Sequence, residues 1–116
     1  MHITHLFTGK DNQSHFEEIE VRMESRGSLG LFTDQAVVKA FFFREVPVGY
    51  RYSWHTVVCR EYVVTLEGKA EIEVSSGETR RFGKGDVLLA EDVSGQGHKT
   101  RVIGKKPWRQ MFITLE

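Results

Sequence analysis

One histidine and one glutamate stand six positions apart in an aromatic, strand-like stretch, GYRYSWHTVVCREYVVTLEG, residues 49–68. The imidazole of His55 and the carboxylate of Glu61 are both ligands that proteins offer to divalent metal ions. On one straight strand, six residues at ~3.3 Å each would hold them about 20 Å apart, too far to share one ion. A common metal site therefore requires the chain to reverse between Thr56 and Arg60, where no Gly, Pro or Asn indicates a turn. The alternative is that both are polar residues near strand ends.

The composition disfavours several classes of protein. With 116 residues, 40% of them hydrophobic, the chain is expected to form one folded domain, residues 1–116. Sixteen basic and sixteen acidic residues cancel, so nucleic acid and anionic membrane surfaces are not expected partners. No apolar run is long enough for a membrane span. The single cysteine, Cys59, cannot form an internal disulfide, which fits a cytoplasmic protein.

Turn residues punctuate the second half of the chain at regular intervals, which is typical of an antiparallel sandwich or barrel. The clearest strand is KAEIEV, in which Ala70, Ile72 and Val74 alternate with charged residues, so one face is predicted to be core and one wet. Four further segments are rich in β-branched and aromatic residues, as strands are. They are EYVVTL, DVLLAE, KTRVI and WRQMFITL.

The first half is less regular. HITHLF is predicted to be a strand, and FEEIEVRM alternates through Ile19, Val21 and Met23; a helix over residues 15–25 is the alternative, because Glu and Met favour helices. Residues 24–35 are predicted to form a loop. VVKAFFF is apolar on both faces, which indicates cover on both faces, with a second subunit as one source.

The spacing of glycines and candidate ligands resembles two motifs of the cupin superfamily. The first consists of a glycine, five residues, His-x-His, three or four residues, a glutamate, six residues and a glycine. Gly49, His55, Glu61 and Gly68 fall on those positions. The second motif opens with Gly-Asp at a turn and ends with a histidine on the next strand, and GDVLLAEDVSGQGH, residues 85–98, is similar.

The resemblance extends over residues 37–115 and implies an all-β fold, a cupin-type double-stranded β-helix, that is, a jelly-roll-like barrel of two antiparallel sheets. Residues 1–36 then supply N-terminal strands and a loop, and residues 37–116 the barrel core. In cupins the chain turns between the histidine pair and the glutamate, which is the reversal that the distance between His55 and Glu61 demands. A homodimer is also implied.

Several positions depart from the cupin motifs. Val57 occupies the second position of the His-x-His pair, so one of the four usual ligands is missing. Glu91 and Val93 stand where a proline and a glycine are expected in the second motif. His98 comes two residues late, and Val102 replaces an asparagine. Three of the four usual ligand positions are therefore filled.

The resemblance makes His55, Glu61 and His98 the candidate metal ligands. Two imidazoles and one carboxylate suit Mn, Fe, Zn, Ni or Co as a divalent ion, and open coordination positions would admit water or substrate. We expect a metal-dependent enzyme acting on a small organic molecule, with oxygenase, isomerase and lyase chemistry all open. The alternative is a non-catalytic binding or sensing module with an apolar cavity and no metal. No organic cofactor is expected.

The cavity is predicted to be lined by residues near the candidate ligands. They are Val57, Cys59, Val63, Thr100 and Phe112. Alternation along the strand places Tyr50, Tyr52 and Trp54 on the face opposite His55, where they are predicted to pack between sheets or subunits. No cation directed into the cavity is evident from spacing alone.

Overall fold

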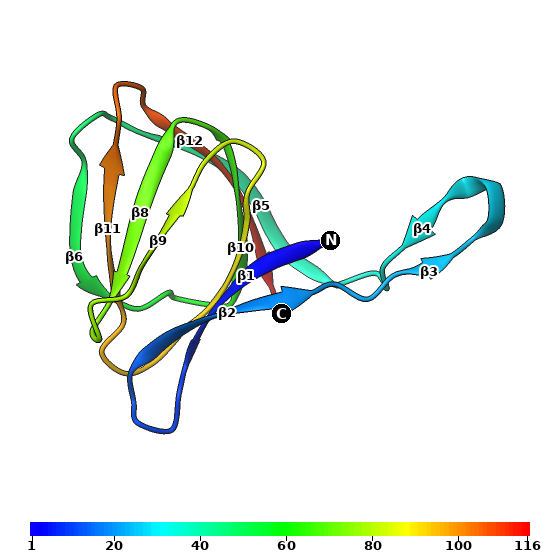
Figure 1. Ribbon diagram of the computed structural model, residues 1–116, viewed down its shortest axis with the longest axis horizontal. Coiled ribbons are helices and arrows are strands. Elements are labelled where there is room, and N and C mark those ends of the chain that lie inside the picture. Colours follow the sequence, from blue (N-terminus) through cyan, green and yellow to red (C-terminus); the bar gives the residue numbers. More distant parts are fainter.

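A computed structural model describes all residues, 1–116, and contains β-strands and one short 3-10 turn. Two sheets face each other and enclose the core (Figure 1). The larger has the order β2-β1-β10-β7-β12-β5, and the smaller has the order β6-β11-β8-β9. No segment forms a helix long and apolar enough to cross a membrane. The predicted all-β barrel of two sheets is confirmed.

The strand bounds follow the predicted segments closely, and β9 is the one barrel strand that the sequence pattern did not indicate. The larger sheet consists of β1 (His2–Thr8), β2 (Ser14–Glu20), β5 (Val38–Val46), β7 (Glu61–Glu67), β10 (Val87–Glu91) and β12 (Trp108–Leu115). The smaller sheet consists of β6 (Arg51–His55), β8 (Lys69–Val74), β9 (Thr79–Phe82) and β11 (His98–Ile103).

The core lies between the two sheets and is built from the inward face of each strand. On β8, Ala70, Ile72 and Val74 are buried, as their alternation predicted. The expectation of a wet outer face is wrong for Glu71, which is only 9% exposed because the guanidinium groups of Arg81 and Arg101 lie over it. Thirteen hydrophobic side chains are buried in one cluster, and this burial is the main free-energy contribution that holds the two sheets together.

The N-terminal strands form part of the larger sheet. β1 pairs antiparallel with β2 and parallel with β10, so it lies between them. Leu6 stands opposite Phe16 on β2 and Ala90 on β10, and all three side chains are buried in the main core. The period-two pattern of residues 16–23 therefore indicated a strand correctly as far as Glu20, whereas Val21 and Met23 lie beyond its end, and the helical alternative is not adopted.

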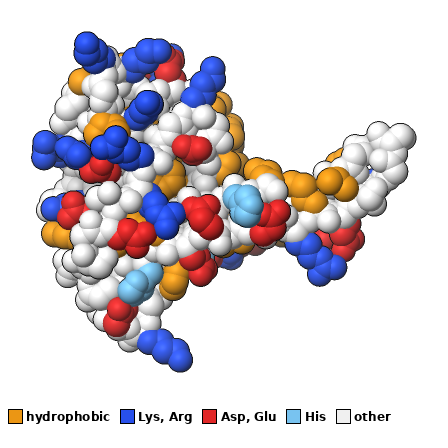
Figure 2. Space-filling view, in the orientation of Figure 1, with side chains coloured by type: hydrophobic (Ala, Val, Ile, Leu, Met, Phe, Trp, Pro, Cys, Tyr) orange, Lys and Arg blue, Asp and Glu red, His pale blue; other side chains and the backbone are white.

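Residues 21–37 leave the barrel as a projecting arm (Figure 1). The arm contains β3 (Glu24–Ser25), a 3-10 turn (Gly27–Leu29) and β4 (Leu31–Phe32), where a loop was predicted. Every residue from 24 to 40 is exposed. Hydrophobic side chains run along the arm and the adjoining margin of the barrel (Figure 2). A hairpin with two residues in each strand has little stability of its own in water.

The arm leads into β5, which ends the larger sheet and pairs only with β12. Phe42 faces inward and stacks on Phe112, with 5.0 Å between ring centroids. Phe41 and Phe43 face outward and are 54% and 66% exposed. Every residue of the VVKAFFF segment is nevertheless exposed, Phe42 at 44%, so one chain does not supply the cover that was predicted, and cover by a second subunit stays a prediction.

Candidate functional site

The chain reverses between the two residues with which the sequence analysis began. It leaves the smaller sheet at His55, crosses one end of the barrel through residues 56–60, and enters the larger sheet at Glu61. Backbone bonds hold this crossing: the Val57 amide donates to the Asp92 carbonyl at 3.2 Å, and the Leu115 amide to the Arg60 carbonyl at 2.9 Å. Long-range pairing thus makes a reversal that no local turn residue announces.

Two imidazoles meet across neighbouring strands. His55 ends β6 and His98 begins β11, and their Cα atoms are partners in the antiparallel ladder. Their ring centroids are 4.4 Å apart at an interplanar angle of 57°. Gly97 allows this approach: it has φ +77°, and any side chain there would collide with the His55 carbonyl. The rings are therefore adjacent because a glycine lets the two strands close on each other.

Each imidazole is anchored through the same ring nitrogen. His55 Nδ1 lies 2.7 Å from the Ser53 carbonyl oxygen, and His98 Nδ1 lies 2.6 Å from Asp92 Oδ2. Because a carbonyl and a carboxylate only accept hydrogen bonds, both Nδ1 atoms carry the proton and donate it. Nε2 of each ring is left as a lone-pair nitrogen without a hydrogen bond from the chain. Histidines that bind metals are usually fixed in this way through their second nitrogen.

Asp92 is a fully buried carboxylate behind His98, with 0% exposure. Its Oδ2 accepts from His98 and from the Ser14 hydroxyl at 2.8 Å, whereas Oδ1 has no partner. A buried carboxylate is costly unless it is hydrogen-bonded. Asp92 lies in the β10–β11 connection, and its hydrogen bond to Nδ1 fixes the orientation of the His98 ring.

Burial sets the protonation of the other two candidate ligands. Loss of water around Glu61 raises the pKa of its carboxyl to about 7, although Arg44 and His98 act in the opposite direction. Loss of water around His55 lowers the pKa of its imidazole. Near neutral pH, His55 is thus in the neutral form that binds metals, and Glu61 exchanges a proton readily.

All three candidate ligands line one cavity of about 240 Å³ between the sheets. As the side chains stand, however, no group of three or more His, Cys, Asp or Glu residues is close enough to hold a metal ion. The paired imidazoles with free Nε2 atoms fit a metal. Glu61, whose carboxylate makes no hydrogen bond, can complete the set only if its side chain moves from its present position.

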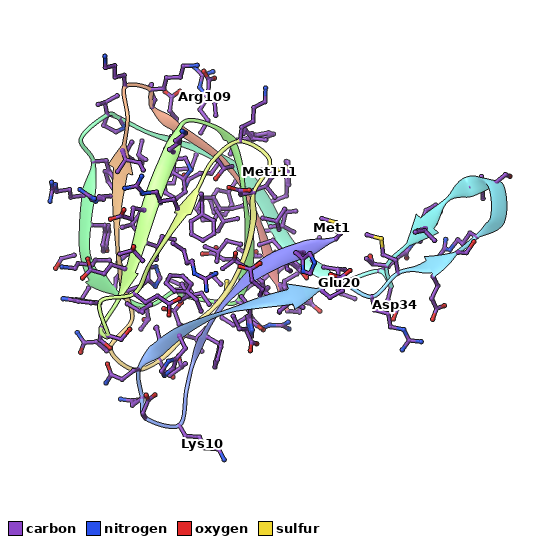
Figure 3. All side chains as sticks on the ribbon, in the orientation of Figure 1. Met1, Lys10, Glu20, Asp34, Arg109 and Met111 are labelled. Atoms are coloured by element: carbon purple, nitrogen blue, oxygen red, sulfur yellow. The ribbon has the colours of Figure 1, made fainter.

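The rest of the cavity lining is mainly apolar. Side chains of both sheets point into the space between them (Figure 3). Val57, Val63, Thr100 and Phe112 of the predicted lining lie on it, but half-buried Cys59 does not. The other main wall residues come from strands of both sheets and from the turn before β6. They are Arg44, Tyr50, Tyr52, Ile72, Leu88, Ala90, Trp108 and Gln110.

The predicted orientation of the aromatic stripe on β6 is wrong for its tyrosines. Tyr50 and Tyr52 line the cavity, and the Tyr52 ring lies 4.0 Å from that of His55. The cause is an irregularity in pairing, because His98 is opposite His55 whereas Thr100 is opposite Tyr52. The extra residue on β6 is a β-bulge, which turns His55 to the tyrosine face. Trp54 points outward, and the Lys99 ammonium lies 5.1 Å from its ring.

Sequence reasoning also missed three polar groups of the site. Arg44 points into the cavity from β5, opposite Gln110 on β12. Its position could have been read from alternation, because Phe42, Arg44 and Val46 share the inward face of one strand. Gln110 follows in the same way from Trp108 and Phe112. No sequence signal marked Asp92, whose role depends on a contact between distant segments.

Comparisons with known proteins agree with this architecture. No family model matches the chain. Over 62 residues it is 31% identical to the cupin-domain-containing oxidoreductase virC of Hypocrea virens, a match covering 53% of this chain and 32% of that protein. The chain spans about a third of the length of the curated relatives it matches.

Solved cupin structures superpose on the chain at low sequence identity. The cupin domain of Schizosaccharomyces pombe Cnp3 has a TM-score of 0.55 at 17% identity, covering 99% of this chain and 88% of that one. A cupin 2 conserved barrel protein of Salinispora arenicola has a TM-score of 0.53 at 22% identity, covering 73% and 71%. At these identities, the likeness establishes the fold.

Proposed function

Starting from the cupin fold of this chain, we propose that it binds a divalent transition metal through His55, His98 and Glu61 and acts as an enzyme on a small organic molecule in the barrel cavity. The observation that carries the proposal is the pair of imidazoles 4.4 Å apart. Each is anchored at Nδ1 and leaves Nε2 free of protein partners.

The protein's own groups prepare the site for an ion. The Ser53 carbonyl and the Asp92 carboxylate hold both rings in the tautomer that presents Nε2 as a lone pair. Burial keeps His55 neutral, so no proton competes for its ring nitrogen near neutral pH. A bound divalent ion supplies a Lewis acid with open coordination positions.

The cavity walls supply what a reaction on a small molecule needs. Val63, Ile72 and Phe112 line the cavity with apolar surface from both sheets. Glu61, with its pKa of about 7, is suited to give or take a proton at its carboxyl oxygen. The relative from Hypocrea virens is named an oxidoreductase. This favours a redox reaction over isomerisation or elimination, with a redox-active ion such as iron or manganese.

Metal content tests the proposal. Protein purified without a nickel column and dialysed against Mn²⁺, Fe²⁺ or Zn²⁺ is expected to hold about one ion per chain, measured by elemental analysis. His55→Ala and His98→Ala are each expected to abolish stoichiometric binding. His2→Ala removes an exposed histidine and is expected to leave the content unchanged. Absence of any ion in the unsubstituted protein, or retention in both site variants, would contradict the metal site.

A second candidate function is a metal-free module that binds or senses a small apolar molecule. It is favoured by the predominantly hydrophobic lining of the cavity and by the lack of three converged ligating side chains. For this function, small apolar ligands are expected to displace a fluorescent hydrophobic probe from the cavity, and to do so equally well before and after the protein is treated with a chelator. Displacement that requires added metal would support the enzyme instead.

A further inference from the structure

Arg44 is an inward-facing cation without a carboxylate partner. It projects from β5 into the cavity, where one Nη2–H donates to the Tyr50 hydroxyl at 2.8 Å. No ion pair joins it to Glu61 on the same cavity wall; Arg44 only lowers that group's pKa at a distance. A guanidinium has five N–H donors in a fork that matches a carboxylate. Most of this donor capacity is unused by the chain.

Gln110 is an unsatisfied acceptor beside Arg44. Its side chain is 1% exposed and lines the cavity, and its Oε1 has no hydrogen-bond partner. Gln110 and Arg44 are directly opposite on paired strands, which places their side chains next to each other on the inward face. A buried acceptor without a partner is costly, so a ligand that supplies a donor there is favoured.

The walls around this polar pair are apolar. Val63, Leu88 and Trp108 supply hydrophobic surface, and the cavity of about 240 Å³ is smaller than most ligand pockets. A ligand that fits must be small and mainly hydrophobic, with its polar groups confined to one end.

We infer that the cavity takes a small carboxylic acid with an apolar body, whose carboxylate binds Arg44 and whose hydroxyl or N–H donor binds Gln110 Oε1. This inference names the substrate class and rests on the proposed function. The acid end then lies over the inward face of the β5–β12 pair.

Binding of matched acids and amides tests the inference on protein stripped of metal with EDTA, so that its outcome does not depend on the metal site. The probes are benzoate, phenylacetate, 3-phenylpropanoate and 3-hydroxybenzoate, each with its primary amide, measured by calorimetry. At least one acid is expected to bind, with its amide tenfold weaker or more. If no acid binds, or if the amides bind as tightly, the inference is overturned.

Substitutions assign the two contacts. Arg44→Gln is expected to remove the preference for acid over amide. The control is Arg109→Gln, which removes an outward cation from β12 (Figure 3) that pairs with Glu45 and Glu67 and is expected to change nothing. Gln110→Leu is expected to remove any advantage of 3-hydroxybenzoate over benzoate while keeping the acid preference. An unchanged preference in Arg44→Gln, with an unchanged melting temperature, would assign the carboxylate elsewhere.

Discussion

The Nδ1 of His98 lies 2.6 Å from Oδ2 of Asp92, in a position where the carboxylate is fully buried and the imidazole is 4% exposed. The pair holds the ring so that Nε2 is free. It also explains how a histidine that comes two residues late in the second motif is still directed at His55, because Asp92 fixes it from the preceding loop. The carboxylate therefore acts on the site through His98.

Asp92→Asn is expected to weaken binding of Co²⁺ or Zn²⁺ by about 10–100-fold, because the amide accepts the His98 hydrogen bond without the negative charge that makes the ring more basic. Titration against a competing chelator measures the affinity. Asp11→Asn is the control, since Asp11 also pairs with a histidine, Nε2 of His15 at 2.9 Å, but on the surface. Equal affinities for Asp92→Asn and the unsubstituted protein would show that the carboxylate does not position the ligand.

Gly97→Ala is expected to separate the two imidazoles. Its Cβ would collide with the His55 carbonyl, so the β6–β11 pairing must open. The expected loss of unfolding free energy is more than ~3 kcal/mol, from backbone strain together with the lost pairing. Gly104→Ala is the control: Gly104 has φ +81° but no atoms within 4 Å of the added Cβ, so about 1–2 kcal/mol of strain is expected. Chemical denaturation compares the two, and similar losses would argue against the close packing of Gly97.

Val57→His is expected to restore a ligand that the first motif otherwise carries. Val57 lines the cavity with His55 and His98 and packs against the core. A third imidazole there is expected to raise the affinity for Zn²⁺ tenfold or more, because a third nitrogen ligand suits the ion. The substitution also costs about 1 kcal/mol of stability by placing a polar ring against apolar neighbours. An affinity that is unchanged or lower would mean that His55 and His98 do not form the core of a metal site.

Glu61→Gln is expected to stabilise metal-free protein at alkaline pH. Burial raises the pKa of Glu61 in the folded state from 4.5 to about 7. The protonated carboxyl therefore contributes stability that is fully present below about pH 4.5, and this contribution is lost as the pH rises through about 7. Because the group is partly exposed, the gain from Glu61→Gln is expected to be only about 1–2 kcal/mol at pH 8, and about zero at pH 4. Melting curves across this range measure it. A constant difference at all pH values would contradict a raised pKa.

The sequence could predict features that rest on periodicity and spacing. The alternation of KAEIEV and the β-branched segments predicted the strands, and the resemblance of the spacing of His55, Glu61 and Gly68 to a cupin motif implied the chain reversal. Both depend on local patterns or on motif distances. The same alternation would also have placed Arg44 inside, had the inward face of VVKAFFFREV been identified.

Other features depend on contacts that no single segment contains. The bulge on β6, which turns His55 towards Tyr52, arises where the strand pairs with β11. The burial of Asp92 requires Ser14 and His98, which lie 78 and 6 positions away. The projecting arm is exposed because no other segment of the chain packs against it. Such relations appear only when distant segments are assembled.

The central claim is tested most directly by anomalous X-ray diffraction from crystals grown with Co²⁺. The account predicts one strong anomalous peak, with Nε2 of His55 and Nε2 of His98 each ~2.0–2.2 Å away and the Glu61 carboxylate turned towards it. A peak bound elsewhere, or none between these two imidazoles at saturating Co²⁺, would contradict it.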